Sequence, residues 1–176
     1  MLSIERTHAA VVACCASPPA LDTLPAIPGT VSCRVAPDEL LLVAPPALLA
    51  ETERRAAGHF AAAEPTALVI DQTDGWSVFS LRGDEARSVF AQLSTVPLPM
   101  GSTGFVQGAV AGGSAKILLA GGIIHLLVPS TLRHHVAGRL NDVCVGRSVV
   151  PATETAFVID EATASFNRGA ATPALR

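Results

Sequence analysis

The sequence is poor in charge, in lysine and in aromatic residues. Only 15% of its 176 residues are charged, against about 25% in a typical soluble domain. Lys116 is the only lysine and the arginines are scattered, so the clustered basic footprint of a nucleic-acid-binding protein is missing. The chain is nevertheless 49% hydrophobic, with a mean hydropathy of +0.45, which excludes a disordered composition. This combination is typical either of a membrane protein or of a subunit that hides surface against a partner.

Long hydrophobic runs are also missing. A membrane-spanning helix needs about 20 consecutive apolar residues, but the best run, residues 117–128, is broken by Gly121-Gly122 and by His125. The apolar run at residues 9–16 follows Glu5 and Arg6 rather than a basic segment, which argues against a secretory signal. The sequence therefore predicts a soluble, cytoplasmic protein, part of whose surface is covered by other chains.

The motifs of several enzyme classes are absent. No two cysteines have the C-x-x-C spacing of a zinc or redox pair, and the four are expected to be reduced thiols: Cys14, Cys15, Cys33 and Cys144. The chain has no phosphate-binding glycine loop ending in Lys-Ser/Thr and no G-x-S-x-G nucleophile elbow. The sequence therefore predicts no catalytic residue, no metal ligand and no cofactor-binding residue of its own.

Composition divides the chain into three parts. Residues 1–30 are rich in Ala and Pro, which predicts an irregular N-terminal arm. Residues 31–146 alternate between strand-like and helix-like patterns and predict a single domain. Residues 147–176 predict an irregular C-terminal tail, in which residues 157–159 are the one strand candidate.

Within the predicted domain, the patterns follow in the order ββα, ββα, βββα. Short apolar runs bounded by turn residues predict strands at 32–35, 39–44, 66–71, 76–81, 105–110, 117–120 and 123–128. Apolar residues at helical spacing, with Pro, Asp84 or Ser130 at the start, predict helices at 45–62, 84–93 and 130–143. Paired strands followed by a covering helix predict an α+β fold, with a mostly antiparallel sheet and helices packed on one face.

The segment Asp71-Gln72-Thr73-Asp74-Gly75-Trp76 is the most informative in the chain. Two apolar strands around an Asp-Gly pair predict a hairpin between 66–71 and 76–81. Asp71 and Asp74 stand at opposite ends of its turn, so an acid/base pair is one interpretation. The favoured interpretation is structural: Asp71, Asp74 and Gly75 hold the turn, because Asp side chains accept hydrogen bonds from nearby backbone amides.

Two further residues have a structural and a binding interpretation. His125 stands in an otherwise apolar strand, and a buried, hydrogen-bonded histidine is favoured over a ligand or a base. Trp76, the only tryptophan, anchors either the core or a partner, since a lone Trp is typical of an interface hot spot. Together with Phe105 and Gln107, Trp76 is a candidate interface residue.

Several short motifs follow one another along the chain in a characteristic order. The turn at 71–76 is followed by Leu81-Arg82-Gly83-Asp84-Glu85-Ala86-Arg87, and is preceded by the turn Pro37-Asp38-Glu39. Val96-Pro97-Leu98-Pro99, Gln107 and the hairpin at 117–128 come after it. In this order the sequence resembles the gamma subunit of heterotetrameric sarcosine oxidase, which is related to the folate-binding domain of the glycine-cleavage aminomethyltransferase. The resemblance covers about residues 31–143.

The resemblance implies a fold like that folate-binding domain, with ββα repeats. It implies a non-catalytic, structural subunit of the gamma type in a flavin-dependent heteromeric oxidase or dehydrogenase acting on sarcosine or another N-methylated amine. The implied partners are larger alpha and beta flavoprotein subunits, with a small delta subunit as a further candidate. Those partners would hold the flavins, NAD and tetrahydrofolate, while this chain alone binds none.

The chain departs from the family at two motifs, and its Ala- and Gly-rich stretch at 108–115 is also unusual. The aminomethyltransferases carry an acidic residue after the Gly-Gly of the hairpin, where it serves the folate amine, whereas Ile123-Ile124-His125 follows here. The family's Cys-Pro-Leu-Asp-Leu segment lacks its Cys and Asp in this chain. Both departures argue against independent folate chemistry. A stand-alone folate-binding one-carbon transfer protein and a stand-alone protein-interaction module remain alternatives.

Overall fold

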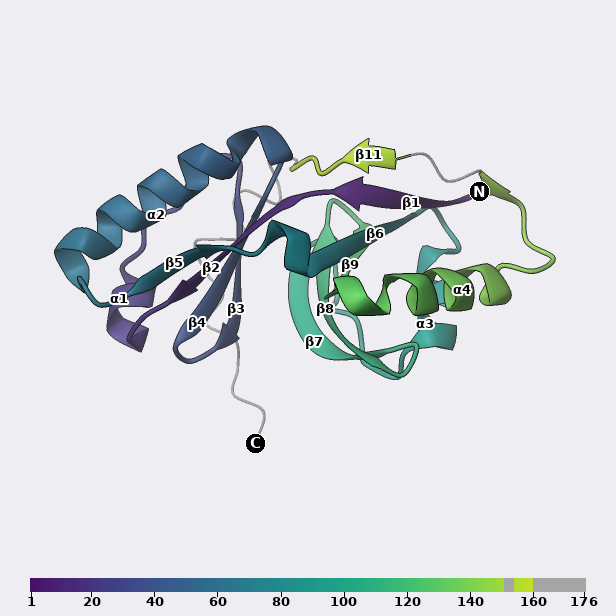
Figure 1. Ribbon diagram of the computed structural model, residues 1–176. Coiled ribbons are helices and arrows are strands. Elements are labelled where there is room, and N and C mark those ends of the chain that lie inside the picture. Colours follow the sequence, from purple (N-terminus) through teal and green to yellow (C-terminus); the bar gives the residue numbers. More distant parts are fainter. Residues whose placement is uncertain (151–153, 160–176) are drawn as a thin grey trace. The chain divides into compact units, whose positions relative to one another are not determined.

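The computed structural model describes residues 1–150 and 154–159 (Figure 1). The fold is α+β, with two mostly antiparallel sheets that each carry helices. The chain forms two compact units: unit 1 consists of residues 1–8 and 74–156, and unit 2 consists of residues 9–73 with the described residues from Phe157 onward. No helix in the described part of the chain is long and apolar enough to cross a membrane.

Unit 1 is built on a seven-stranded sheet in the order β10-β1-β6-β9-β8-β7, with β11 pairing in parallel with β1. Its strands are β1 (Leu2–His8), β6 (Trp76–Arg82), β7 (Gly104–Val110), β8 (Gly113–Ala120), β9 (Ile123–Pro129), β10 (Val149–Val150) and β11 (Glu154–Ala156). Its helices are α3 (Ala86–Leu93) and α4 (Arg133–Val143), with short 3-10 turns at Thr73–Gly75 and Ser130–Leu132.

One apolar cluster joins the helices of unit 1 to one face of its sheet. In α3, Val89, Phe90 and Leu93 lie at helical spacing and are buried in this cluster. Alternate residues of β9, such as Ile124 and Leu126, point into the same cluster. The opposite face of the sheet is therefore left to the residues between them, including His125.

Gly83 connects β6 to α3 in a conformation that only glycine adopts readily. Its φ is +99°, and a Cβ at this position would lie 1.9 Å from the carbonyl oxygen of Met1. Gly101 is the natural comparison, because its φ is +101° and a Cβ added there would have no neighbouring atom within 4 Å. The two glycines thus separate backbone strain from steric conflict.

We expect Gly83→Ala to lower the free energy of unfolding by roughly 2–4 kcal/mol, since strained backbone and a clash add together. Gly101→Ala, which meets the strain alone, should cost about 1 kcal/mol. Urea denaturation of the two variants measures the difference. Equal costs for both variants would contradict the close approach of Gly83 to the Met1 carbonyl.

Unit 2 is built on a four-stranded antiparallel sheet in the order β3-β4-β2-β5. Its strands are β2 (Ala10–Cys15), β3 (Val31–Ala36), β4 (Glu39–Ala44) and β5 (Leu68–Asp71). Its helices are α1 (Pro18–Asp22) and α2 (Leu49–Ala63), the latter preceded by a 3-10 turn at Pro46–Leu48. Ala56 and Phe60, four residues apart on α2, pack with Val12 and Leu42 of the sheet.

The N-terminal thirty residues differ from the irregular arm that the sequence predicts. They form β1, β2 and α1, and β2 is an inner strand between β4 and β5. The proline-rich composition of this segment favoured an irregular arm. The strands that pair with β1 and β2 lie far away in the sequence, so no local pattern indicated the pairing. Of the predicted tail, Val149–Val150 and Glu154–Ala156 are short strands and residues 157–159 are not a strand. Residues 151–153 and 160–176 lie outside the described residues.

The predicted hairpin between 66–71 and 76–81 is wrong. β5 pairs with β2 in unit 2, whereas β6 pairs with β1 and β9 in unit 1. At the Thr73–Gly75 turn the chain passes from unit 2 back to unit 1. An Asp-Gly pair between two apolar strands indicates a turn, but it does not determine which strands pair.

Candidate functional site

A line of polar side chains crosses the sheet of unit 1 on the face opposite α3 and α4. His125 Nδ1 lies 2.7 Å from the hydroxyl oxygen of Ser80, its cross-strand neighbour in β6. The Ser80 hydroxyl lies 2.5 Å from that of Thr7 in β1. All three residues are buried, so their polar groups form one internal hydrogen-bond chain.

The chain continues toward Glu5, which stands two residues before Thr7 on the same face. The carboxylate of Glu5 accepts hydrogen bonds from Ser3 Oγ at 2.8 Å, Thr155 Oγ1 at 3.0 Å and Arg82 Nε at 3.3 Å. Thr155 also lies 3.4 Å from Thr7 Oγ1. These contacts join β1, β6, β9 and β11 through side chains as well as through the backbone.

The protonation states in this network follow from burial and from charge. Burial lowers the pKa of His125 to about 4, and the Arg82 charge acts in the same direction, while Glu5 opposes them. Burial alone raises the pKa of Glu5, but the hydrogen bonds from Ser3, Thr155 and Arg82, together with the Arg82 charge, leave it lowered. At neutral pH His125 is therefore neutral and Glu5 is ionised.

This network is suited to holding strands together rather than to catalysis. The network pairs one hydroxyl, that of Ser80, with an imidazole, that of His125. Ser80 has no exposed surface and His125 is 1% exposed, so a substrate does not reach this pair. A general base also works best with a pKa near the operating pH, and that of His125 is far below it. We interpret the Ser80–His125 pair as structural.

A groove of about 350 Å³ lies beside α4 in unit 1, and Cys144 is one of its lining residues. Arg147, which also lines it, forms an ion pair with Glu85. Burial raises the pKa of the Cys144 thiol, Arg147 lowers it and Glu85 raises it, with a net increase. The thiol is therefore protonated at neutral pH and lacks the activation of a catalytic cysteine. No cluster of metal-binding side chains occurs among the described residues.

The four cysteines are free thiols in two classes of exposure. Burial raises the pKa of Cys14 and of Cys33 to about 12, whereas Cys15 and Cys144 are only partly buried. We expect iodoacetamide at pH 8 to alkylate Cys15 and Cys144 slowly and to leave Cys14 and Cys33 unmodified, because the thiolate is the reactive species. Peptide mass spectrometry checks this, with alkylation in urea as the control in which all four react. Rapid labelling of Cys33 in the folded chain would contradict its burial.

The predicted turn residues fall on both sides of the boundary between the units. Asp71 ends β5 in unit 2 and its carboxylate accepts a hydrogen bond from the Thr73 amide at 2.8 Å. Asp74 begins the second part of unit 1, and its carbonyl accepts a hydrogen bond from Ser130 Oγ at 2.6 Å. Within the described residues, no hydrogen bond joins the carboxylates of Asp71 and Asp74, so the acid/base interpretation gains no support. The role of Asp71, Asp74 and Gly75 in holding the turn stays a prediction.

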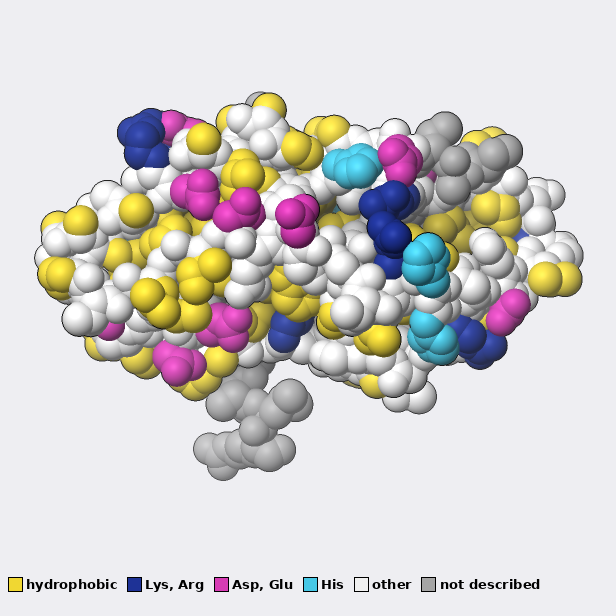
Figure 2. All heavy atoms as spheres, in the orientation of Figure 1, with side chains coloured by type: hydrophobic (Ala, Val, Ile, Leu, Met, Phe, Trp, Pro, Cys, Tyr) yellow, Lys and Arg dark blue, Asp and Glu magenta, His cyan; other side chains and the backbone are white. Residues whose placement is uncertain are grey.

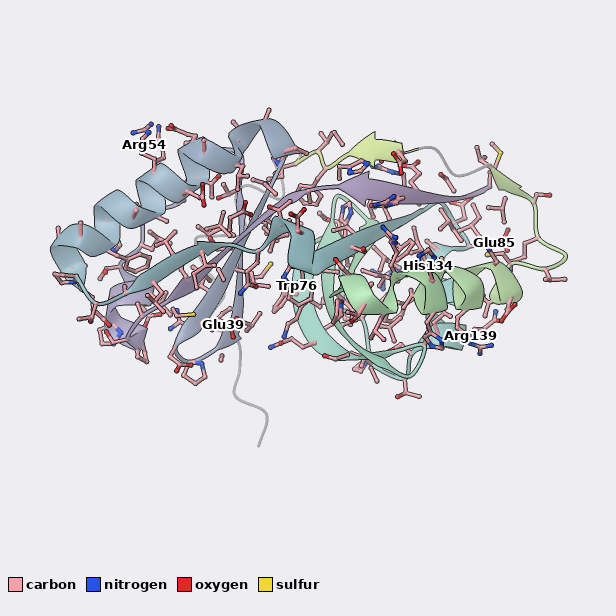
Figure 3. All side chains as sticks on the ribbon, viewed as in Figure 1. Glu39, Arg54, Trp76, Glu85, His134 and Arg139 are labelled. Carbon is pink, nitrogen blue, oxygen red and sulfur yellow. The ribbon has the colours of Figure 1, made fainter. Side chains whose placement is uncertain are left out.

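The predicted interface residues are spread along unit 1. Trp76 opens β6 opposite Pro129 and is half-buried (Figure 3). Phe105 is half-buried in β7, and Gln107 is exposed and accepts a hydrogen bond from Lys116 Nζ of β8. Nothing in the structure brings a partner to them, so their interface role also stays a prediction.

Two predicted helix caps are replaced by other contacts. The N-cap of α3 is Glu85 rather than Asp84, and the N-cap of the turn before α4 is Pro129 rather than Ser130. Neither N-cap makes a side-chain capping bond. Ser130 Oγ instead donates a hydrogen bond to the Asp74 carbonyl, which ties the start of this turn to the Thr73–Gly75 turn that precedes β6.

An exposed apolar strand in unit 2 is the feature that sequence reasoning missed. Among the described strands, β5 is the last of its sheet, and its Leu68 and Ile70 are 56% and 42% exposed. The face in Figure 2 shows hydrophobic side chains gathered over the region of β5. The apolar run Leu68-Val69-Ile70 was visible in the sequence, but the predicted hairpin with 76–81 would have covered this edge.

Comparison with known proteins identifies the fold. No known protein-family profile matches the sequence, and no curated protein matches it. A chain of the heterotetrameric sarcosine oxidase from Corynebacterium sp. U-96 has a similar structure, with a TM-score of 0.69, 19% identity, and 86% of this chain and 88% of that chain covered. Glycine cleavage system aminomethyltransferase T from Bartonella henselae has a TM-score of 0.61 and 15% identity, with 88% of this chain and 47% of that chain covered. This chain thus spans about half of the aminomethyltransferase.

These likenesses confirm the predicted fold class. The α+β architecture with mostly antiparallel sheets is the one shared with the sarcosine oxidase chain and with part of the aminomethyltransferase. At 19% and 15% identity they establish the fold and not the activity.

Proposed function

We propose that this chain is a non-catalytic, gamma-type subunit of a flavin-dependent heteromeric oxidase or dehydrogenase that acts on sarcosine or another N-methylated amine. The observation that carries the proposal is the fold match along nearly the whole of both chains, 86% of this one and 88% of the sarcosine oxidase chain. The two chains are thus close in length, as expected of two versions of one small subunit. The motifs at residues 71–87 support the same assignment.

The β8–β9 hairpin supports a role without folate chemistry. Gly121 and Gly122 form its two-residue turn with φ values of 56° and 81°, which is the geometry of a primed turn. The residues that follow are Ile123, Ile124 and His125, of which Ile124 and His125 are buried. At the place where the aminomethyltransferases carry an acidic residue, this chain therefore has two isoleucines and a buried histidine, and no carboxylate.

The proposal assigns the cofactors to other chains, which also cover part of the surface of this one. Alpha and beta flavoprotein subunits, with a small delta subunit as a further candidate, would hold the flavins, NAD and tetrahydrofolate in the cytoplasm. The low charge of this chain and the exposed apolar side chains of β5 suit a protein that is covered by partners.

Co-expression with the products of adjacent genes tests the assignment. We expect the affinity-tagged chain to copurify in stoichiometric amounts with flavoproteins, and the flavin absorbance to follow the partner chains when the complex is dissociated. A well-behaved monomer that ignores these neighbours would refute the proposal.

A stand-alone folate-binding, one-carbon transfer protein is the second candidate, because the fold is shared with part of the aminomethyltransferase. Calorimetric titration of the purified chain with tetrahydrofolate separates the two candidates. The subunit proposal expects no heat of binding at high micromolar tetrahydrofolate, whereas saturable binding by the chain alone would favour the second candidate.

A further inference from the structure

We propose that the open edge of β5 binds an extended, apolar segment with basic flanking residues, which a partner subunit supplies and which pairs with β5 as an additional strand of the sheet in unit 2. The inference rests on the proposed function, since it names how one partner of the subunit binds. Three properties of β5 carry it: its backbone, its side chains and its charge.

The backbone of β5 has hydrogen-bonding groups that point away from the sheet. Gln72 N donates to the Val11 carbonyl at 2.8 Å, and Ile70 stands opposite Ala13 in β2. In an antiparallel pair the residues alternate between facing the partner strand and facing away. Ile70 therefore faces β2, whereas the N–H and C=O groups of Val69 and Asp71 point outward. Among the described strands β5 pairs with β2 alone, so these groups form an open template.

The side chains of β5 add an apolar column to that template. Leu68 stands opposite Cys15 and Ile70 opposite Ala13, so both project from the face of the sheet that carries these residues. Ala13 is fully buried, whereas Leu68 and Ile70 are exposed. The strand contains no Lys or Pro, the residues that protect the exposed edge of a sheet from pairing. An added strand with apolar side chains would cover this column.

The negative charge around this edge favours basic residues on either side of the apolar partner segment. Residues 9–73 contain seven acidic and three basic residues, a net charge of −4. Glu39 lies on the same face as Leu68, opposite Cys15 in β4. Burial raises the pKa of the Cys15 thiol, and the charges of Glu39 and Asp38 raise it further. Neither of them is in an ion pair among the described residues. Figure 3 labels Glu39 at the start of β4.

The same charge argues against a second copy of this chain as the occupant. Two copies joined through β5 would bring together two units of net charge −4 and two Asp71 residues. Like charges placed opposite each other across strands destabilise the pairing. A basic, apolar strand from a different chain satisfies both the backbone and the charge.

Hydrogen exchange of the co-expressed complex tests strand addition at single residues. Ile70 and Gln72 amides should exchange slowly both in the free chain and in the complex, because they face β2. Val69 and Asp71 amides should exchange quickly in the free chain and at least about tenfold more slowly in the complex, because an added strand accepts their hydrogen bonds. Unchanged exchange at Val69 and Asp71 in an intact complex would overturn the inference and leave the proposed function standing.

Lysine substitutions give a second readout of the same edge. We expect Ile70→Lys to raise the dissociation constant of the complex about tenfold or more, because it places a charge in the apolar column. Met100→Lys is the matched control, since Met100 is 95% exposed in unit 1, and it should leave the constant unchanged. Equal affinities of Ile70→Lys and the unchanged chain would overturn the inference alone.

Two other outcomes are also decisive. If the unchanged chain forms no complex with its neighbours, both the proposed function and this inference fail. If the free chain forms a dimer in which Val69 and Asp71 amides become protected, the occupant is a second copy and the inference is wrong.

Discussion

Replacing His125 with Asn is expected to flatten the pH dependence of stability. Burial lowers the pKa of His125 to about 4 from its ordinary value of 6.5, so the unfolded chain binds a proton between these values and the folded chain does not. Stability therefore rises with pH through this window. The contribution of the neutral His125 is fully present above about pH 6.5 and is lost as the pH falls toward 4. The difference is worth about 3 kcal/mol, of which about 2 kcal/mol is lost between pH 7 and pH 5.

Urea denaturation at pH 7 and pH 5 measures this effect. The Asn amide occupies the place of Nδ1 and can keep the hydrogen bond to Ser80, so His125→Asn should lose about 2 kcal/mol less than the unchanged chain on acidification. Glu5, whose pKa is lowered, contributes stability that is lost only below its ordinary value of 4.5, which is outside the window. His134→Asn, at an exposed position on α4, is the control. An identical pH dependence with and without His125 would contradict its burial in the neutral form.

Truncating Phe90 in α3 is expected to cost the most stability of any single change considered. Phe90 is 2% exposed and lies in the cluster that joins α3 and α4 to the sheet of unit 1. Phe90→Ala removes a buried ring and leaves a cavity, which typically costs about 3–5 kcal/mol. Gln92→Ala, at an exposed position of the same helix, should change stability by less than about 0.5 kcal/mol.

Fluorescence of Trp76 provides the readout for unit 1. It is the only tryptophan in a chain without tyrosine, and it is half-buried at the start of β6. Denaturation midpoints from this signal should therefore move strongly toward lower urea for Phe90→Ala and hardly at all for Gln92→Ala. Matching midpoints for the two variants would show that the α3 cluster does not hold unit 1 together.

Elements that depend on local sequence could be predicted. The β3–β4 turn, helices α2, α3 and α4, and the β8–β9 hairpin with its Gly121-Gly122 turn all follow from residues close together in the chain. The fold class followed from their order. Turn chemistry and helical spacing act over a few residues, so a single sequence contains enough information for them.

Strand pairing between distant segments could not be predicted in this way. β1 lies between β6 and β10, which are more than sixty residues away in the chain, and β2 lies between β4 and β5. The prediction of a buried, hydrogen-bonded His125 is confirmed, but the extension of its network through Ser80 to Thr7 was missed, because Thr7 was placed in an irregular arm. The alternation of Ser3, Glu5 and Thr7 with Leu2 and Ile4 was the available indication of a strand.

Native mass spectrometry of the co-expressed complex tests the central proposal most directly. The account predicts an assembly that contains this 18.0 kDa chain in a fixed ratio to larger flavoprotein chains, and that releases flavin only with those chains. An isolated 18.0 kDa monomer in the presence of the same chains, or flavin or folate retained by that monomer, would contradict it.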